Sequence, residues 1–279
     1  HVFGVQPRLA DDSVYSFFVR QRPLADVAVI TRSGVPICPG HLELAKLDSL
    51  LGKGVNVVTR LRSALHGSGR PEGPVVIDCC PLLNVLSLNA VFACDLLLVP
   101  VSADFLALQG AQAVDRALDA LEPVFKRRLP RRYLLTRYDG RRRMSGEVAA
   151  RMAEMLRPGE ICATRIRESV KLAESPALAL DVFRHAPGSH GAHDYRALID
   201  EFGKFATEAN APQGPTATQP ALKQSLMELT TAISGEDSYL AGYPQVADLQ
   251  AKLTKNLQAM TETQDEVKRL TKGTGMPRY

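Results

Sequence analysis

A single carboxylate closes an apolar run in the first third of the chain. Asp78 follows residues 74–77, Pro-Val-Val-Ile, and Cys79, Cys80 and Pro81 come directly after it. Such a run is typical of a strand buried in a parallel sheet, and open α/β sheets bind ligands at the carboxyl edge. A carboxylate at that edge can hold Mg²⁺, directly or through water. The alternative is an acid that caps the following helix, and the residues alone do not separate the two interpretations.

A glycine-rich loop that could cradle phosphates does not occur in the sequence. The pattern Gly-x-x-x-x-Gly-Lys-Ser/Thr is absent between His1 and Tyr279. The nearest lookalike, residues 51–55, has no Ser or Thr after Lys53 and no Gly five residues before Gly52, so we reject it. We therefore expect that this chain by itself cannot neutralise the charge of a bound triphosphate, which supplies much of phosphoryl-transfer catalysis.

Positive charge is concentrated between residues 126 and 143. The formal net charge of the chain is only +4, yet Asp139 is the only acid in this stretch. A local excess of Lys and Arg is the electrostatic footprint of a protein that holds a nucleic-acid backbone without reading its sequence. The alternative is a solvated helix end and loop. The side chains that we assign to a candidate DNA surface are Arg127, Arg128, Arg131, Arg132, Arg141, Arg142 and Arg143.

Other residues that could do chemistry carry weaker patterns. His185, His190 and His193 flank a Pro- and Gly-containing loop with no Cys or carboxylate at a compelling metal-ligand spacing, so we expect surface histidines. The five cysteines have neither disulfide-framework nor zinc spacing, which favours reduced thiols in a cytosolic protein. No apolar run approaches the roughly 20 residues that a membrane helix needs.

The elements that must position these residues alternate between short apolar strands and amphipathic helices. This order predicts an α/β fold, a mostly parallel sheet flanked by helices, because helical crossovers join parallel strands. The predicted strands cover residues 27–30, 35–38, 75–78, 95–101, 132–136 and 161–166, of which 75–78 and 95–101 are expected to be fully buried. The predicted helices cover residues 11–20, 42–50, 57–65, 83–93, 106–125, 145–156 and 191–209, and Ser145 is expected to cap the sixth.

The composition changes after residue 209, which predicts three regions. Residues 1–209 form the α/β domain, residues 210–221 form a Pro-rich polar linker, and residues 222–279 form a helical tail. In the tail, Val246, Leu249, Leu253 and Leu257 follow a three- and four-residue spacing. That spacing suits either a helix that folds back on the domain or a short coiled coil for a partner.

The motifs between Val75 and Phe202, taken in order, resemble the ParA-type partition ATPases of the deviant Walker A class. Each motif alone is weak, but their order and spacing together are specific. The matching pieces are Val-Ile-Asp-Cys-Cys-Pro at 76–81, Leu-Asn-Ala at 88–90, Ala-Cys-Asp at 93–95, Val-Pro-Val at 99–101, Phe-Leu-Ala-Leu-Gln-Gly at 105–110, Leu-Leu-Thr-Arg-Tyr-Asp-Gly-Arg at 134–141, Val-Lys-Leu-Ala-Glu-Ser-Pro at 170–176, Asp-Val-Phe at 181–183 and Gly-Ala-His-Asp-Tyr-Arg-Ala-Leu at 191–198.

The resemblance implies a P-loop NTPase-like fold and a role for five positions. Asp78 would be the Walker B acid that helps to hold Mg²⁺, and Pro81 would form the turn after it. Thr136, Arg137 and Arg167 would lie on the nucleotide-base side of the site. A Pro-Arg-Asn that is frequent in the family is replaced here by Arg-Glu-Ser at 167–169. The family's phosphate loop and first strand would precede His1, so no catalytic residue is assigned within the chain.

The resemblance also implies a function. Members of the family are Mg²⁺-dependent ATPases that dimerise with ATP, bind DNA non-specifically, and partition plasmids or chromosomes or position another cargo in the bacterial cytoplasm, at the nucleoid. The expected partners are DNA, a second copy of the protein and a ParB-like or other adaptor protein. The alternative is a non-catalytic binding or scaffold protein that keeps the fold without hydrolysing ATP. Membrane-associated positioning is disfavoured, because residues 272–279 cannot form a basic amphipathic helix.

Overall fold

A parallel pair of strands forms the centre of the domain in the computed structural model, which describes residues 2–47, 55–67, 73–79, 84–125 and 128–209. Strand β3 (Leu97–Ser102) pairs in parallel with β4 (Arg131–Thr136), in register from Leu97 opposite Arg131 to Ser102 opposite Thr136. An extended segment, residues 160–167, continues on the other side of β4 through a parallel bridge between Tyr133 and Ile161. We call β3, β4 and this segment the first, second and third lanes of the sheet. All three run in the same direction, as the predicted crossovers require.

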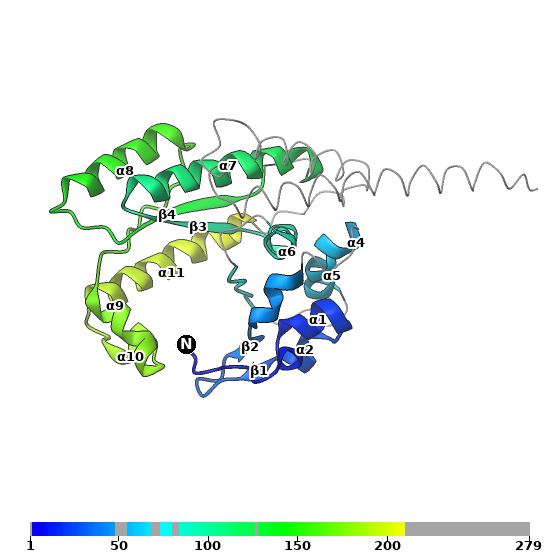
Figure 1. The fold of residues 1–279 in the computed structure, drawn as a ribbon. Coiled ribbons are helices and arrows are strands. Elements are labelled where there is room, and N and C mark those ends of the chain that lie inside the picture. Colours follow the sequence, from blue (N-terminus) through cyan, green and yellow to red (C-terminus); the bar gives the residue numbers. More distant parts are fainter. Residues whose placement is uncertain (1, 48–54, 68–72, 80–83, 126–127, 210–279) are drawn as a thin grey trace, which may run out of the picture.

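Helices cover the two faces of this sheet (Figure 1). Helices α7 (Phe105–Phe125) and α8 (Arg143–Met155) lie on one face, and α11 (His190–Ala209) lies on the other. The alternation along β4 explains the arrangement, because Tyr133 and Leu135 pack among α7 and α8 residues whereas Leu134 packs with Leu198 of α11. Helix α6 (Val85–Ala93) packs against the second half of α7 in a third cluster.

The first part of the chain forms a smaller helical layer with one hairpin. Its elements are η1 (Ala10–Asp12), α1 (Val14–Arg20), α2 (Leu24–Val27), β1 (Val29–Ile30), β2 (Pro36–Ile37), η2 (Leu42–Lys46), α4 (Val55–Val58) and α5 (Arg60–His66). Ser13 caps α1 by accepting from the N–H of Tyr15 at 3.2 Å. Phe17, Phe18 and Leu61 form the core of this layer. The two short extended runs expected here exist, but they pair antiparallel.

Short helices connect the third lane to α11. They are α9 (Val170–Glu174), η3 (Ser175–Leu178) and α10 (Val182–His185). The long helices predicted at 106–125 and 191–209 are confirmed. Helix α8 begins at Arg143, with Arg142 as its N-cap residue and no side-chain cap, so the prediction that Ser145 caps it is wrong. Ser145 is instead buried and accepts a long hydrogen bond from the N–H of Asp139.

The strand predicted at residues 75–78 is not formed. These residues are irregular, and Val75 and Val76 are 49% and 92% exposed. A strand is defined by the backbone hydrogen bonds of a neighbour, and no strand of the described residues pairs with this segment. Strand β3 is likewise not buried on both faces, since Leu98 and Pro100 are exposed while Val101 is buried. The predicted linker and helical tail, residues 210–279, lie outside the described residues.

Candidate functional site

The three parallel lanes place a group of charged side chains at one edge. Asp104 follows β3, Arg137 follows β4, and Arg167 ends the third lane. Backbone hydrogen bonds join the lanes beyond the strands, from Ala103 N–H to the Thr136 carbonyl and from Tyr138 N–H to the Ile166 carbonyl, both at 3.0 Å. Because the carboxyl ends of parallel strands meet at the same edge, the structure places Thr136, Arg137 and Arg167 at one edge of the sheet, and their role beside a nucleotide stays a prediction.

Ion pairs and hydrogen bonds hold the side chains at this carboxyl edge. Arg137 Nε lies 3.0 Å from a carboxylate oxygen of Glu168, so these two side chains pair between the ends of adjacent lanes. The backbone N–H of Ala107 donates to Asp104 at 2.8 Å and holds the pKa of that carboxyl below its ordinary value. Arg137 has a φ of +52°, in the left-handed region where a residue with a side chain is strained. Such backbone strain is concentrated at functional sites.

The predicted metal ligand, Asp78, lies on the irregular segment and is exposed. Pro81, the predicted turn residue, lies outside the described residues. Within the described part of the chain, no group of three or more His, Cys, Asp or Glu side chains could hold a metal ion. A lone carboxylate still suits Mg²⁺ that arrives with a nucleotide, because that ion keeps several waters and takes its other ligands from phosphates. The role of Asp78 therefore stays a prediction.

The basic cluster that the sequence singles out divides into two groups in the structure. Arg141, Arg142 and Arg143 are the exposed group, with 91%, 66% and 93% of their side chains open to solvent. They lie where the turn from β4 enters α8, and they pair with Asp139 of the turn and with Glu147 of α8. Arg127 lies outside the described residues.

The second group is covered by protein, which corrects the predicted DNA surface. Arg131 is fully buried, and its guanidinium lies 2.7 Å from Asp115 and 2.9 Å from Glu122 of α7. Arg128 is 18% exposed and pairs with Glu160 as well as with acids of α7. Carboxylates occupy both guanidinium groups, and that of Arg131 is fully buried, so Arg131 and Arg128 belong to the structure of the domain and not to a DNA surface.

Arg132 is likewise engaged within the protein. It is half-buried, its guanidinium lies 4.0 Å from the centre of the Phe205 ring, and it donates to the carbonyl of Arg131 at 3.0 Å. Of the seven arginines predicted to contact DNA, only the turn residues Arg141, Arg142 and Arg143 are exposed in the part of the chain that the structure describes.

The sequence analysis did not predict the acids that bind Arg128 and Arg131. Asp115, Asp119 and Glu122 lie on one face of α7, four and three residues apart, which is a detectable helical spacing. Tyr133 donates to Asp115 at 2.7 Å. Burial is the main cause that raises the pKa of this tyrosine, and the hydrogen bond to Asp115 raises it further. We call Arg128, Arg131, Asp115, Asp119, Glu122, Tyr133 and Glu160 the ionic network.

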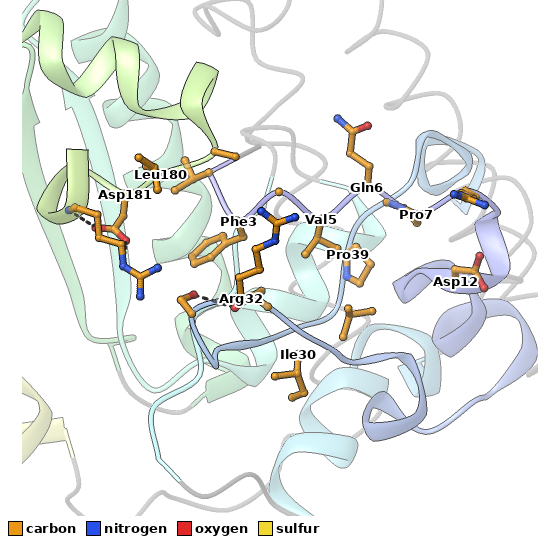
Figure 2. Close-up of a pocket in the computed structure, with 18 residues that line it drawn as sticks. Phe3, Val5, Gln6, Pro7, Asp12, Ile30, Arg32, Pro39, Leu180 and Asp181 are labelled. Carbon is orange, nitrogen blue, oxygen red and sulfur yellow. Dashed lines mark hydrogen bonds and ion pairs between the residues drawn. The ribbon is translucent and has the colours of Figure 1, made fainter.

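A pocket of about 640 Å³ lies elsewhere, between the first residues, the hairpin and residues 179–184 (Figure 2). Phe3, Val5 and Ile30 provide apolar surface, and Arg32 extends among them without an ion pair to any described residue. No residue of the carboxyl edge lines it. The pocket is therefore a separate feature from the predicted nucleotide site.

Comparison with solved structures identifies the fold of the chain. Solved structures with the same fold include cobyrinic acid a,c-diamide synthase from Mycobacterium smegmatis with bound ADP and magnesium, with a TM-score of 0.60 and 23% identity over 77% of this chain and 80% of that one. A putative plasmid partition protein from Borrelia burgdorferi B31 bound to AMPPNP has a TM-score of 0.59 and 15% identity over 72% and 77%. These similarities confirm the predicted fold class, a P-loop NTPase-like α/β fold.

Similarity in sequence identifies the family. A family model described as an AAA domain matches residues 1–130. The chromosome partitioning protein ParA of Caulobacter vibrioides is 30% identical over 194 residues, 68% of this chain and 72% of the relative. The chromosome-partitioning ATPase Soj of Thermus thermophilus is 37% identical over 182 residues, 62% and 70%. The cell division protein PomZ of Myxococcus xanthus is 28% identical over 76% and 66%. The chain belongs to the ParA family of partition and positioning ATPases.

No helix of the described residues combines the length and the apolar character that crossing a membrane would need.

Proposed function

We propose that this chain carries the core of an ATP- and Mg²⁺-dependent partition or cargo-positioning protein that dimerises with nucleotide bound and holds DNA without sequence preference. Two observations support the proposal. The chain shares its family with proteins named for chromosome partition and cell division. It also exposes a turn of three consecutive arginines, Arg141, Arg142 and Arg143, beside the carboxyl edge of its parallel sheet.

The arginine turn is the observation that carries the DNA part of the proposal. Exposed pairs such as Arg141 with Asp139 and Arg143 with Glu147 contribute little to stability, so these guanidinium groups can exchange their acids for phosphates. Each arginine that neutralises a phosphate releases a counterion, which makes the affinity depend steeply on salt. A DNA matrix read only through its backbone suits a protein that must move over a nucleoid.

The nucleotide part of the proposal assigns roles to the carboxyl edge. Asp78 would help to hold the Mg²⁺ that neutralises phosphate charge, and Thr136, Arg137 and Arg167 would border the nucleotide base. The positions of these last three at adjacent lane ends support that assignment, because open α/β sheets bind ligands there. A second copy of the protein and an adaptor of the ParB type that stimulates hydrolysis would complete the system, at the nucleoid in the bacterial cytoplasm.

Charge reversal tests the DNA part. Replacing Arg141, Arg142 and Arg143 together with Glu should remove low-salt retention on a DNA column and flatten the slope of affinity against salt. The matched control reverses Arg8, Arg32 and Arg157, which are exposed and have no side-chain hydrogen bond or ion pair with any described residue. Both triple variants change the net charge equally. Equal loss of DNA binding in both would mean that net charge, and not the arginine turn, is responsible.

A second candidate function rests on the absence of a phosphate-loop pattern in the sequence. A scaffold protein that keeps the fold without hydrolysing ATP would also conserve the sheet and the arginine turn. The coding sequence upstream of His1 separates the two: a lysine-containing, glycine-rich loop there supports the ATPase, and a start codon without such a loop supports the scaffold. Equilibrium binding of a fluorescent ATP analogue to the protein as its genome encodes it provides the biochemical readout.

A further inference from the structure

The third lane of the sheet, residues 160–167, has an unusual neighbour along its outer side. Its inner side bonds to β4, with Cys162 N–H donating to the Tyr133 carbonyl and Ile166 N–H donating to the Leu135 carbonyl, both at 2.9 Å. No strand of the described residues pairs with the outer side. Backbone N–H groups on a sheet edge need partners, since an unpaired buried group costs about as much as a lost hydrogen bond.

Helix α11 supplies those partners from two carboxylates. Glu201 accepts from the N–H of Ala163 at 2.7 Å and from the N–H of Thr164 at 2.9 Å. Asp194 accepts from the N–H of Arg167 at 2.9 Å. The two acids are two helical turns apart and therefore lie on the same face of α11. The helix thus holds the lane in its middle, at Ala163 and Thr164, and at its carboxyl end, at Arg167.

Asp194 also holds the side chain of Arg167. Its two oxygens lie 2.6 Å from Nη2 and 3.0 Å from Nε of the guanidinium. Asp194 itself is buried, with 8% exposure. Burial alone would raise the pKa of Asp194, but the hydrogen bonds from Arg167 lower it overall, so the carboxylate stays charged. One buried acid therefore fixes both the backbone and the side chain at the end of the lane.

The position of Arg167 sets the position of the neighbouring residues at the carboxyl edge. A parallel bridge joins Tyr138 to Arg167, and the N–H of Glu168 donates to the Tyr138 carbonyl at 3.0 Å. Glu168 in turn pairs with the strained Arg137. The contacts lead from Asp194 through Arg167 and Glu168 to Arg137.

We propose that Asp194 is a positioning residue for the base side of the nucleotide site, with Glu201 holding the same lane from two helical turns further along the same face of α11. The inference rests on the proposed nucleotide function and adds the helix that sets the geometry of that site. It assigns Asp194 no contact with the nucleotide. A nucleotide should therefore lose the part of its affinity that comes from the base, whereas a ligand without a base should be unaffected.

The test compares two ligands on the protein as its genome encodes it. Asp194→Asn should weaken ATP binding about tenfold, since small displacements in a site have effects of that order or larger. The affinity for inorganic tripolyphosphate, which has no base, should stay unchanged. The matched control is Asp200→Asn, the same chemical change on the same helix at an exposed side chain that has no hydrogen bond or ion pair with any described residue. It should leave both affinities unchanged.

Equal weakening of both ligands, or unchanged ATP affinity in Asp194→Asn, would overturn the positioning role. Absence of nucleotide binding by the unsubstituted protein would instead overturn the proposed function, and amide hydrogen exchange distinguishes the two failures without any ligand. The N–H groups of Ala163, Thr164 and Arg167 should exchange slowly in the unsubstituted protein. Asp194→Asn should accelerate Arg167, and Glu201→Gln should accelerate Ala163 and Thr164. Fast exchange of all three in the unsubstituted protein would disprove the edge contacts themselves.

Discussion

Removing the guanidinium of Arg131 should destabilise the domain strongly and leave its DNA affinity intact. Arg131→Ala removes a fully buried cation from Asp115, Asp119 and Glu122, which lie 2.7, 3.0 and 2.9 Å from it. Breaking a buried ion pair from one side costs about 3–5 kcal/mol, because the remaining charges are left uncompensated. Arg128 still contacts the same three acids, so we expect the lower end, about 3 kcal/mol.

That loss should lower the unfolding midpoint by about 6–12 °C, because 1 kcal/mol corresponds to about 2–4 °C for a domain of this size. The sequence has no Trp, so unfolding is best followed by far-UV circular dichroism in urea and on heating. The control is Arg143→Ala, a 93% exposed side chain, which should change the stability by no more than about 0.5 kcal/mol.

The two variants should rank in the opposite order for DNA retention, measured well below both unfolding midpoints. Arg131→Ala should bind as the unsubstituted protein does, and Arg143→Ala should bind less tightly. The reasoning would be refuted if Arg131→Ala lost less than about 1 kcal/mol of stability and also lost DNA affinity. That result would return Arg131 to the surface where the sequence pattern first placed it.

Two further predictions concern single titrating groups. The hydrogen bond from the Arg141 side chain, aided by the Arg141 N–H, lowers the pKa of Asp139 to about 2 from 3.8. Because the folded-state pKa is depressed, the stabilising contact is present above about pH 4 and is lost as the pH falls towards 2. A carboxyl NMR titration should show this value and its return towards 3.8 in Arg141→Ala; an ordinary value in the unsubstituted protein would contradict the contact. Burial raises the pKa of Cys162 to about 12, so its thiolate is scarce at pH 8. Alkylation followed by mass spectrometry should therefore modify the exposed Cys79 first and Cys162 only on unfolding, whereas early labelling of Cys162 would count against its buried position.

Much of the fold could be predicted because its patterns are local. The long amphipathic periods at 106–125 and 191–209 became α7 and α11, since each has one apolar face and needs no distant residue to define it. The apolar run at 95–101 became β3, which begins two residues later and ends one residue later than predicted. Helix boundaries were less certain, and α8 begins two residues before the Ser that the sequence suggested as its cap.

The positions of the predicted site residues followed from the sequence only in part, and the differences have one physical cause. Thr136, Arg137 and Arg167 meet at the carboxyl edge because parallel topology alone brings lane ends together. Asp78 could not be placed in this way, since a strand at 75–78 depends on a neighbour that its own residues do not provide. The contacts of Asp194 with Arg167 could not be predicted from the sequence, because the two residues are 27 positions apart.

The sequence by itself determined the family, the order of helices and strands, and the presence of a strongly basic stretch, because residue order and helical period are properties of the chain. Only the tertiary structure decided which of those basic residues face solvent. Arg131 and Arg141 look equivalent in sequence, but the acids of α7 enclose one and leave the other open. A charge acts on whatever the fold places beside it, and that neighbour is set by packing between distant segments.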